Sequence, residues 1–281
     1  MITSTQLLRE IAADNPFQPA TSIWRAVELA LIINTPFPEG RGLDLGCGDG
    51  TILQRILKYV GPREVVGIDL DPRETDAAAA LGLYSAVHTG PGSEIPEGDG
   101  TFDFVFSNSV LEHIPNLGPV FAEVSRVLKP GGIFYFTVPS QTFPDLLYGP
   151  WLPGANRRAY NDMVTRRIAV EHYFSVDQCS EWMVEAGMAL EQTIPYFSRK
   201  VTRRWEFVAR ITSGILYQLA GMRRQPIEIQ HSLKIRTRRR GILATLAVAA
   251  VMLLGIGALN DDDGPRHGYG GYLFIARKPS S

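Results

Sequence analysis

The sequence LDLGCGDG at residues 43–50 decides the fold class, because the hydrophobic pattern changes from that of a strand to that of a helix across it. The apolar run at 41–46 predicts a buried strand, and TILQRILKYV at 51–60 has apolar residues at helical spacing. Glycines in such a turn let the backbone approach a nucleoside without a Cβ clash. The stretch therefore predicts a nucleotide-type loop between a strand and a helix.

Strand and helix patterns keep alternating after this loop. We expect further strands at 64–70, 84–89, 102–108, 133–139, 188–194 and 271–278, and helices at 76–82, 116–129 and 176–187. Pro130-Gly131-Gly132 is expected to break the chain before the 133–139 strand, and Ser175 is expected to cap the 176–187 helix. This alternation is typical of a doubly wound α/β sheet.

Two acidic residues indicate which kind of nucleoside the loop would bind. Asp69 ends the second strand, where a carboxylate can accept two hydrogen bonds from a ribose diol. Asp44 precedes the first glycine, and a carboxylate there favours a cationic ligand over a pyrophosphate. The third glycine of a dinucleotide fingerprint would fall at Thr51, so the loop disfavours a nicotinamide oxidoreductase.

Four motifs in order resemble those of the class I, Rossmann-like S-adenosylmethionine-dependent methyltransferases, in particular the small-molecule type 11-like group. They are LDLGCGDG, VVGIDLDP at 65–72, DGTFDFVFSNSVLEHIPN at 99–116 and VSRVLKPGGIFYFTVPS at 124–140. The resemblance is strong over about 41–140 and weaker to about 194. It implies S-adenosylmethionine as cofactor and a seven-stranded, mostly parallel sheet whose last strand is antiparallel, matching GYLFIARK at 271–278.

The resemblance also implies which residues hold the cofactor. The loop would line its methionine end, Asp69 would hold the ribose, and Asn108 would lie near its methyl-bearing side. The loop after the third strand has proline where the family often has an adenine-contacting Asp, so Ser93 or Glu94 would substitute. The candidate cofactor-binding residues are Asp44, Gly46, Cys47, Gly48, Gly50, Asp69, Leu70, Ser93, Glu94 and Asn108.

Three residues are candidates for chemistry at the acceptor, because methyl transfer to a hydroxyl needs alignment and a base. His113 is the leading base candidate, since it follows the fourth strand, whose carboxyl end borders the ligand crevice in such sheets. His172 and Tyr173 are second candidates from the lid side. The alternative is that His113 packs at a helix start and that the other two form a hydrogen-bonded core pair.

Charge and hydropathy single out a segment before the last expected strand. Residues 199–240 hold twelve Lys and Arg against two Glu, although the whole chain has a net charge of −1. Residues 241–259 follow and contain no charged side chain. An apolar run of this length is long enough for a membrane span. We expect an insertion that contacts an anionic membrane at its cytoplasmic face. A buried helix in a protein without membrane contact is the alternative.

These patterns predict the domain organisation and the compartment. We expect a core at 1–198 with a lid insertion at 139–176, a helical insertion at 199–263 and the last strand at 264–281. The 139–176 stretch is rich in aromatic residues and arginine without clear periodicity. Two distant cysteines and the absence of a secretory pattern favour the cytoplasm, and no metal site is expected.

The functional expectation is methyl transfer to an oxygen of a small-molecule, glycan or lipid-linked acceptor. Nucleic acid is disfavoured as a substrate, because Ser-Asn-Ser-Val at 107–110 stands where an Asn-Pro-Pro-Tyr type motif would follow the fourth strand. A noncatalytic nucleoside-binding scaffold at the membrane is the main alternative. A nicotinamide-dependent oxidoreductase is a further alternative that the loop spacing disfavours.

Overall fold

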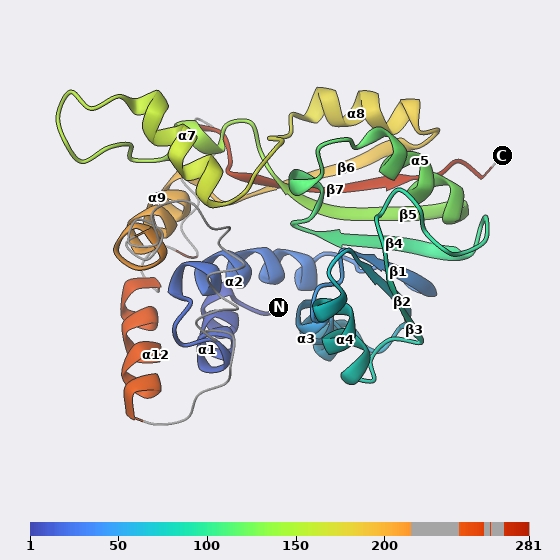
Figure 1. The fold of residues 1–281 in the computed structure, drawn as a ribbon, viewed down its shortest axis with the longest axis horizontal. Coiled ribbons are helices and arrows are strands. Elements are labelled where there is room, and N and C mark those ends of the chain that lie inside the picture. The colour runs from blue at the N-terminus through green and yellow to red at the C-terminus, as the bar shows by residue number, and fades with distance from the viewer. Residues whose placement is uncertain (215–241, 256–258, 260–266, 281) are drawn as a thin grey trace. The chain divides into compact units, whose positions relative to one another are not determined.

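The computed structural model describes residues 1–214, 242–255, 259 and 267–280 (Figure 1). The chain divides into two compact units. The sheet unit comprises Thr35–Ser140, His172–Pro195 and Gly271–Ser281. The helical unit comprises Met1–Asn34, Gln141–Glu171 and Tyr196–Gly270.

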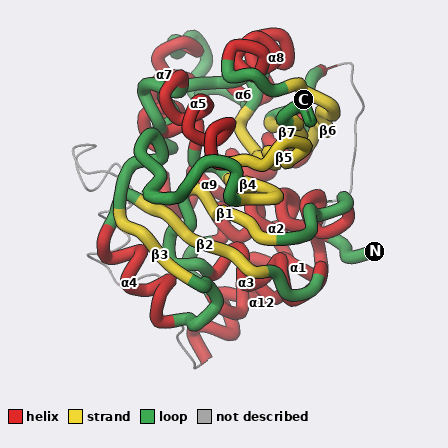
Figure 2. Tube along the Cα trace, turned by 90° about the vertical axis from the view of Figure 1, so that its right-hand side faces the viewer, coloured by secondary structure: helices red, strands yellow, loops and turns green. Residues whose placement is uncertain are grey.

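The sheet unit contains a seven-stranded sheet in the order β3-β2-β1-β4-β5-β7-β6 (Figure 2). Its strands are β1 Arg41–Leu45, β2 Glu64–Asp69, β3 Ala86–Thr89, β4 Phe102–Asn108, β5 Leu128–Pro139, β6 Ala189–Tyr196 and β7 Gly271–Arg277. The pairings among β1 to β5 are parallel, and β7 pairs with β5 antiparallel. The predicted mostly parallel sheet with an antiparallel last strand is confirmed.

Helices cover both faces of this sheet, as a doubly wound fold requires (Figure 1). They are α3 Thr51–Val60, α4 Pro72–Ala80, α5 Gly118–Val127 and α8 Val176–Glu185, with a short 3-10 turn η1 at Leu111–His113. Buried residues of α5 and α8 share one hydrophobic cluster with strand residues such as Leu43 and Phe134. The Ser175 hydroxyl accepts a hydrogen bond from the Gln178 backbone N–H at 3.1 Å, so the predicted helix cap is confirmed.

One local prediction is wrong at the start of β5. The strand begins at Leu128, so Pro130-Gly131-Gly132 lies inside it, and Leu128 belongs to the strand and not to the preceding helix. The pairing with β4 shifts register between Phe102 and Phe104, as at a β-bulge. Gly131 has a φ of +80° and donates its N–H to the Lys278 carbonyl at 2.9 Å. The glycines therefore bend the strand without ending it.

The described part of the helical unit contains four helices that the sequence patterns did not indicate: α1 Ser4–Asp14, α2 Pro19–Asn34, α6 Phe143–Leu146 and α7 Arg157–Arg167. It also contains α9 Arg199–Ala209, a π-helical turn Arg210–Gly214 and α12 Ile242–Gly255, which lie within the predicted helical insertion at 199–263. Trp24 of α2 packs against Phe143, Phe197 and Trp205, with ring centroids 4.4 to 5.6 Å apart. Part of the aromatic content of the expected lid is thus a hydrophobic core.

Helix α12 accounts for most of the predicted 241–259 apolar run, whose residues 241 and 256–258 lie outside the described residues. Val251 is buried in the helical unit, whereas Leu246 is 60% and Leu253 is 80% exposed. Ala249 and Ala250 are exposed between these two leucines, so one face of the helix exposes apolar side chains to solvent. Among the helices that the structure describes, none combines the length and apolar character that crossing a membrane requires.

Candidate functional site

The glycine loop (residues 46–50) leaves β1 and leads into α3. Gly46, Gly48 and Gly50 have φ values of +76°, +52° and +76°, a region that residues with a Cβ rarely adopt. The backbone N–H groups of Gly46 and Cys47 both donate to the Ile68 carbonyl of β2, at 2.8 and 3.0 Å. The loop is therefore fixed to the neighbouring strand, and its conformation depends on glycine.

Two of these glycines serve different purposes. A Cβ at Gly46 would lie 2.4 Å from Cγ2 of Val110, so Gly46 allows the segment after β4 to pack on the loop. A Cβ at Gly48 would have no neighbour closer than Oε2 of Glu74 at 3.9 Å. Gly48 therefore leaves open space beside exposed backbone, which is what the approach of a ligand to the loop needs.

Asp69 ends β2 with its carboxylate beside the glycine loop. One oxygen, Oδ2, accepts the Gly48 N–H at 2.9 Å, and Oδ1 accepts the Asp71 N–H at 3.0 Å. A carboxylate oxygen has capacity for a second hydrogen bond, so both remain able to accept from a ligand hydroxyl. Leu70 follows directly and is 72% exposed, an apolar side chain available to pack on a planar ring.

Asp44 lies on β1, two residues before Gly46, and is 4% exposed. Its Oδ2 accepts a hydrogen bond from the Tyr84 hydroxyl at 2.7 Å. Burial raises the pKa of Asp44 to about 7, while the bond from Tyr84 lowers it and the charge of Asp69 raises it. Tyr84 was not among the residues expected from the sequence, because a tyrosine 40 residues away carries no local signal of this contact.

In the described part of the chain, the charged groups that shift the pKa values of Asp44, Cys47 and Tyr84 are acids. Asp44, Asp69 and Glu74 raise the pKa of the Cys47 thiol together with burial, which is the largest cause. Asp49 adds to the negative field around Tyr84. A ligand that brings positive charge would relieve this repulsion, whereas a diphosphate would increase it. The open space at Gly48, the acids and the exposed Leu70 together fit a cationic nucleoside such as S-adenosylmethionine.

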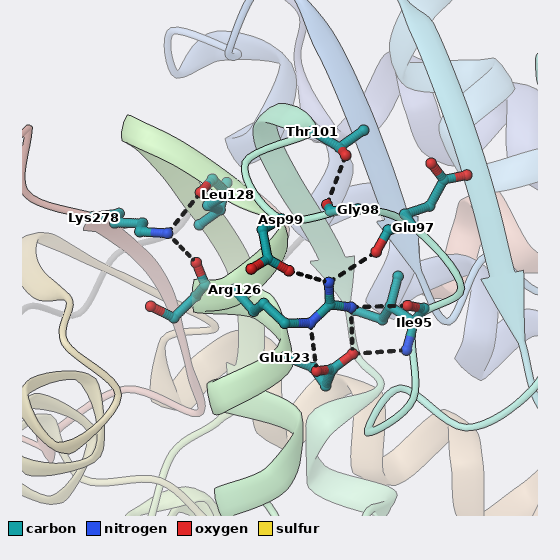
Figure 3. A network of polar contacts seen from close by, with 10 residues as sticks. Ile95, Glu97, Gly98, Asp99, Thr101, Glu123, Arg126, Leu128 and Lys278 are labelled. Atoms are coloured by element: carbon teal, nitrogen blue, oxygen red, sulfur yellow. Dashed lines mark hydrogen bonds and ion pairs between the residues drawn. The ribbon is translucent and has the colours of Figure 1, made fainter.

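The loop after β3, which carries Ser93 and Glu94, is held by Arg126 of α5 (Figure 3). Arg126 donates to the Glu97 and Ile95 carbonyls at 2.8 and 2.9 Å and to both carboxylate oxygens of Glu123. These bonds with Arg126 hold the pKa of Glu123 below its usual value. Gly90 at the start of this loop donates its N–H to the Asp69 carbonyl at 2.9 Å. The loop is therefore fixed beside the end of β2.

Asn108 lies at the carboxyl end of β4 and is 8% exposed. Its side-chain amide donates to Oγ1 of Thr137 on β5 at 2.5 Å. Ser109 follows with a φ of +53°, and its N–H bonds the Thr137 carbonyl at 3.1 Å. Asn108 thus ties two strand ends together, and its orientation is set by Thr137.

His113 and His172 are brought together by backbone contacts. The His172 N–H donates to the carbonyl of Glu112, the residue before His113, at 3.2 Å. Nε2 of His172 lies 3.0 Å from the Pro115 carbonyl, and since a carbonyl only accepts, Nε2 carries the proton and Nδ1 is the basic nitrogen. The His113 side chain is 44% exposed, with Nε2 4.0 Å from Oε1 of Glu112.

Tyr173 lies in the same neighbourhood, at the carboxyl ends of β4 and β5. It precedes Phe174, which bridges to Ser140 and donates its N–H to the Pro139 carbonyl at 3.0 Å. The structure therefore groups the three predicted acceptor-side residues, while Asp44, Asp69 and the glycine loop lie at the ends of β1 and β2, where Gly46 packs against Val110 of the segment that leads to His113.

The two cysteines of the chain lie apart from any metal-binding cluster in the described residues. Cys47 and Cys179 are both buried free thiols, and burial raises the pKa of Cys179 to about 12. Across the described parts of the chain, no cluster of three or more His, Cys, Asp or Glu side chains could hold a metal ion.

The sheet order, the glycine loop and the acid after β2 define the fold of a class I methyltransferase, and the comparisons with known proteins agree. Residues 43–136 match the methyltransferase-domain family. A solved S-adenosylmethionine-dependent methyltransferase from Thermotoga maritima superposes with a TM-score of 0.56 at 15% identity, covering 97% of this chain and 98% of that one. Residues 43–136 are therefore similar to the methyltransferase-domain family, and the fold is that of the class I S-adenosylmethionine-dependent methyltransferases.

Curated relatives match only part of the chain. A dimethylglycine N-methyltransferase from Parasynechococcus marenigrum (strain WH8102) is 35% identical over 127 residues, which is 43% of this chain and 45% of that protein. A sterol 24-C-methyltransferase from Gibberella zeae is 33% identical over 106 residues, which is 34% of this chain and 27% of that protein. The chain therefore spans less than half the length of these relatives, and their named acceptors differ in chemistry.

Proposed function

We propose that the protein transfers a methyl group from S-adenosylmethionine to an oxygen of a small-molecule, glycan or lipid-linked acceptor. The observation that carries this proposal is the glycine loop with open space at Gly48, flanked by the carboxylates of Asp44 and Asp69. In this proposal the loop accommodates the methionine end, Asp69 accepts from the ribose and Leu70 packs on the adenine. Ser93 and Glu94 contact the adenine edge, and Asn108 lies near the methyl-bearing side.

The acceptor chemistry is assigned to the residues grouped at the ends of β4 and β5. When bound, S-adenosylmethionine supplies a methyl group already activated for in-line displacement, so the protein needs mainly to align, desolvate and deprotonate the acceptor. We assign proton acceptance to His113, whose imidazole reaches solvent. His172, through Nδ1, and Tyr173 then orient the acceptor hydroxyl.

Binding and turnover separate this proposal from its alternatives. Calorimetry with S-adenosylmethionine, S-adenosylhomocysteine and NAD is expected to give binding of the first two and none of the third. Mass spectrometry of a lipid and small-molecule extract, incubated with the protein and isotope-labelled donor, is then expected to reveal a labelled methyl ether or ester. Binding without label transfer to any extract would favour a noncatalytic scaffold, and binding of NAD alone would favour an oxidoreductase.

A membrane role is supported by two features of the segment at 199–263, which we assign as one insertion within the core. Its first part, 199–240, has a charge of +10 from twelve basic and two acidic residues. Helix α12 follows with Leu246 and Leu253 on its exposed apolar face. Basic residues contribute about 1 kcal/mol each near an anionic bilayer surface, and an apolar helix face inserts at the headgroup boundary. The protein is thus assigned to the cytoplasmic face of an anionic membrane.

Vesicle flotation tests this membrane contact. The protein is expected to float with vesicles containing anionic lipid at low salt and to be released at high salt, because the Debye length shortens. The variant Leu246→Asp with Leu253→Asp should stay with the unbound fraction, and Leu81→Asp, at an exposed leucine of the sheet unit, serves as the matched control. Equal flotation of the double variant and the control would contradict a role for α12.

A further inference from the structure

Tyr84 is a residue of the sheet unit whose side chain contacts Asp44 and lies beside Gly50 of the glycine loop. It stands two residues before β3, on the segment that follows α4. Its hydroxyl donates to Asp44, and its ring lies where Cβ atoms at Gly50 and Gly67 would come within 2.8 and 3.2 Å of it. Two glycines on different elements therefore give room to one aromatic ring.

This contact holds the buried carboxylate of Asp44 near the end of β1. Asp44 is too deeply buried to be oriented by solvent, and Tyr84 is the side chain from which it accepts its hydrogen bond. Tyr84 itself is enclosed, and burial beside Asp44 raises the pKa of its phenol above the ordinary value, so it stays a donor at physiological pH. The bond thus favours the ionised form of Asp44.

We propose that Tyr84 is a positioning residue of the cofactor site, and that the Asp44–Tyr84 pair makes the affinity for a cationic nucleoside depend on pH near neutrality. The inference rests on the proposed binding of S-adenosylmethionine. An ionised Asp44 attracts the positive ligand, whereas a protonated Asp44 does not, so affinity rises as pH rises.

The midpoint of this change follows from the groups that face Asp44. Burial places the pKa of Asp44 at about 7, with Asp69 opposing ionisation and Tyr84 assisting it. Cys47 and Asp49 also act on Tyr84, and Glu74 acts on Cys47, and none of these three groups is cationic. Without ligand, ionising Asp44 costs stability. Stability from this group is therefore full below about pH 4 and is lost as pH rises through about 7.

Calorimetric titration with S-adenosylmethionine between pH 5.5 and 8.5 tests the proposal in three variants. In Tyr84→Phe, loss of one hydrogen bond is expected to move the pH midpoint up by about 0.7 unit, and so to weaken binding about 3-fold at pH 7 and about 5-fold at pH 5.5. In Asp44→Asn, the part of the pH dependence of the affinity that is attributed to Asp44 should vanish. Only the pH dependence caused by titration of the ligand's own amine should then be left. Tyr59→Phe on α3 is the control and should match the wild type.

The outcomes distinguish this inference from the proposed function. The inference is supported by an upward shift of the pH midpoint in Tyr84→Phe together with a shallower pH profile of affinity in Asp44→Asn. A tyrosine with a merely structural role would lower the stability of the protein without moving the pH midpoint of binding. Wild-type binding with the same midpoint in Tyr84→Phe overturns the inference alone. Absence of wild-type binding at every pH overturns the proposed function as well. Carboxyl-carbon NMR of Asp44 in the ligand-free protein gives the midpoint independently of binding.

Discussion

Asp69→Ala is expected to weaken S-adenosylmethionine binding by about 1–3 kcal/mol, or about 5- to 150-fold in Kd, because charge-assisted hydrogen bonds to the ribose are lost. The Ala side chain also leaves the Gly48 and Asp71 N–H groups without the carboxylate that they now donate to. Isothermal titration calorimetry at fixed pH measures the effect. Unchanged affinity would remove Asp69 from the proposed site.

Two variants separate the ribose contact from the support of the loop. Asp69→Asn keeps one acceptor oxygen and removes the charge, so an intermediate loss of affinity is expected. Asp71→Asn removes the same charge two residues further on and preserves a good N-cap for α4, where Asp71 now accepts the Arg73 N–H at 2.9 Å. This control should bind S-adenosylmethionine as the wild type does.

His113→Gln is expected to lower kcat by about 10²- to 10⁴-fold with little change in the KM for S-adenosylmethionine, because a general base acts only in the transition state. The rate is measured as label transfer to the acceptor found in the extract experiment. Because Gln is polar and of similar length to His, the loss of kcat measures the loss of the proton-accepting group more than a change in packing.

His88→Gln provides the matched control for this substitution. His88 lies on β3 of the same unit, where its ring nitrogen Nε2 is 3.1 Å from Oε1 of Glu97. It is expected to retain wild-type kcat. If His113→Gln also retained it, the base would have to be sought at Nδ1 of His172, and His172→Gln would then carry the large loss.

The sheet could be predicted from the sequence because each strand is a short apolar run between residues that break it. FDFVFSN became β4 and GYLFIAR became β7, which pairs antiparallel with β5 as the resemblance implied. The start of β5 was missed because Pro-Gly-Gly usually ends an element, whereas here the pairing register shifts and the strand continues.

The helical unit was harder to predict. Helix α2 buries nine of its sixteen residues, among them Ser22 and Glu28, so its apolar face is not marked by a simple period. Glu28 is tolerated there because it accepts from the Tyr196 hydroxyl at 2.9 Å and pairs with Arg25. Such a contact across 168 residues leaves no local pattern in the sequence.

The cofactor loop was predictable because its chemistry is local, whereas its support is not. Glycines at 46, 48 and 50 lie within five residues, and the structure gives all three positive φ angles. Tyr84, Val110 and Arg126 act on the loops from other elements. Whether Ser93 and Glu94 contact adenine stays a prediction, as do the base role of His113 and the predicted domain boundaries.

The place of β7 between β5 and β6 has a consequence for synthesis on the ribosome. Residues 197–270 separate β6 from the strand beside which it finally lies. A nascent chain that has released only the first six strands therefore exposes two unpaired sheet edges, at β5 and at β6, which invite association with other chains. Strand β7 can pair with β5 and β6 only after residues 271–277 have left the ribosome. A stalled or shortened translation product would therefore be prone to aggregate.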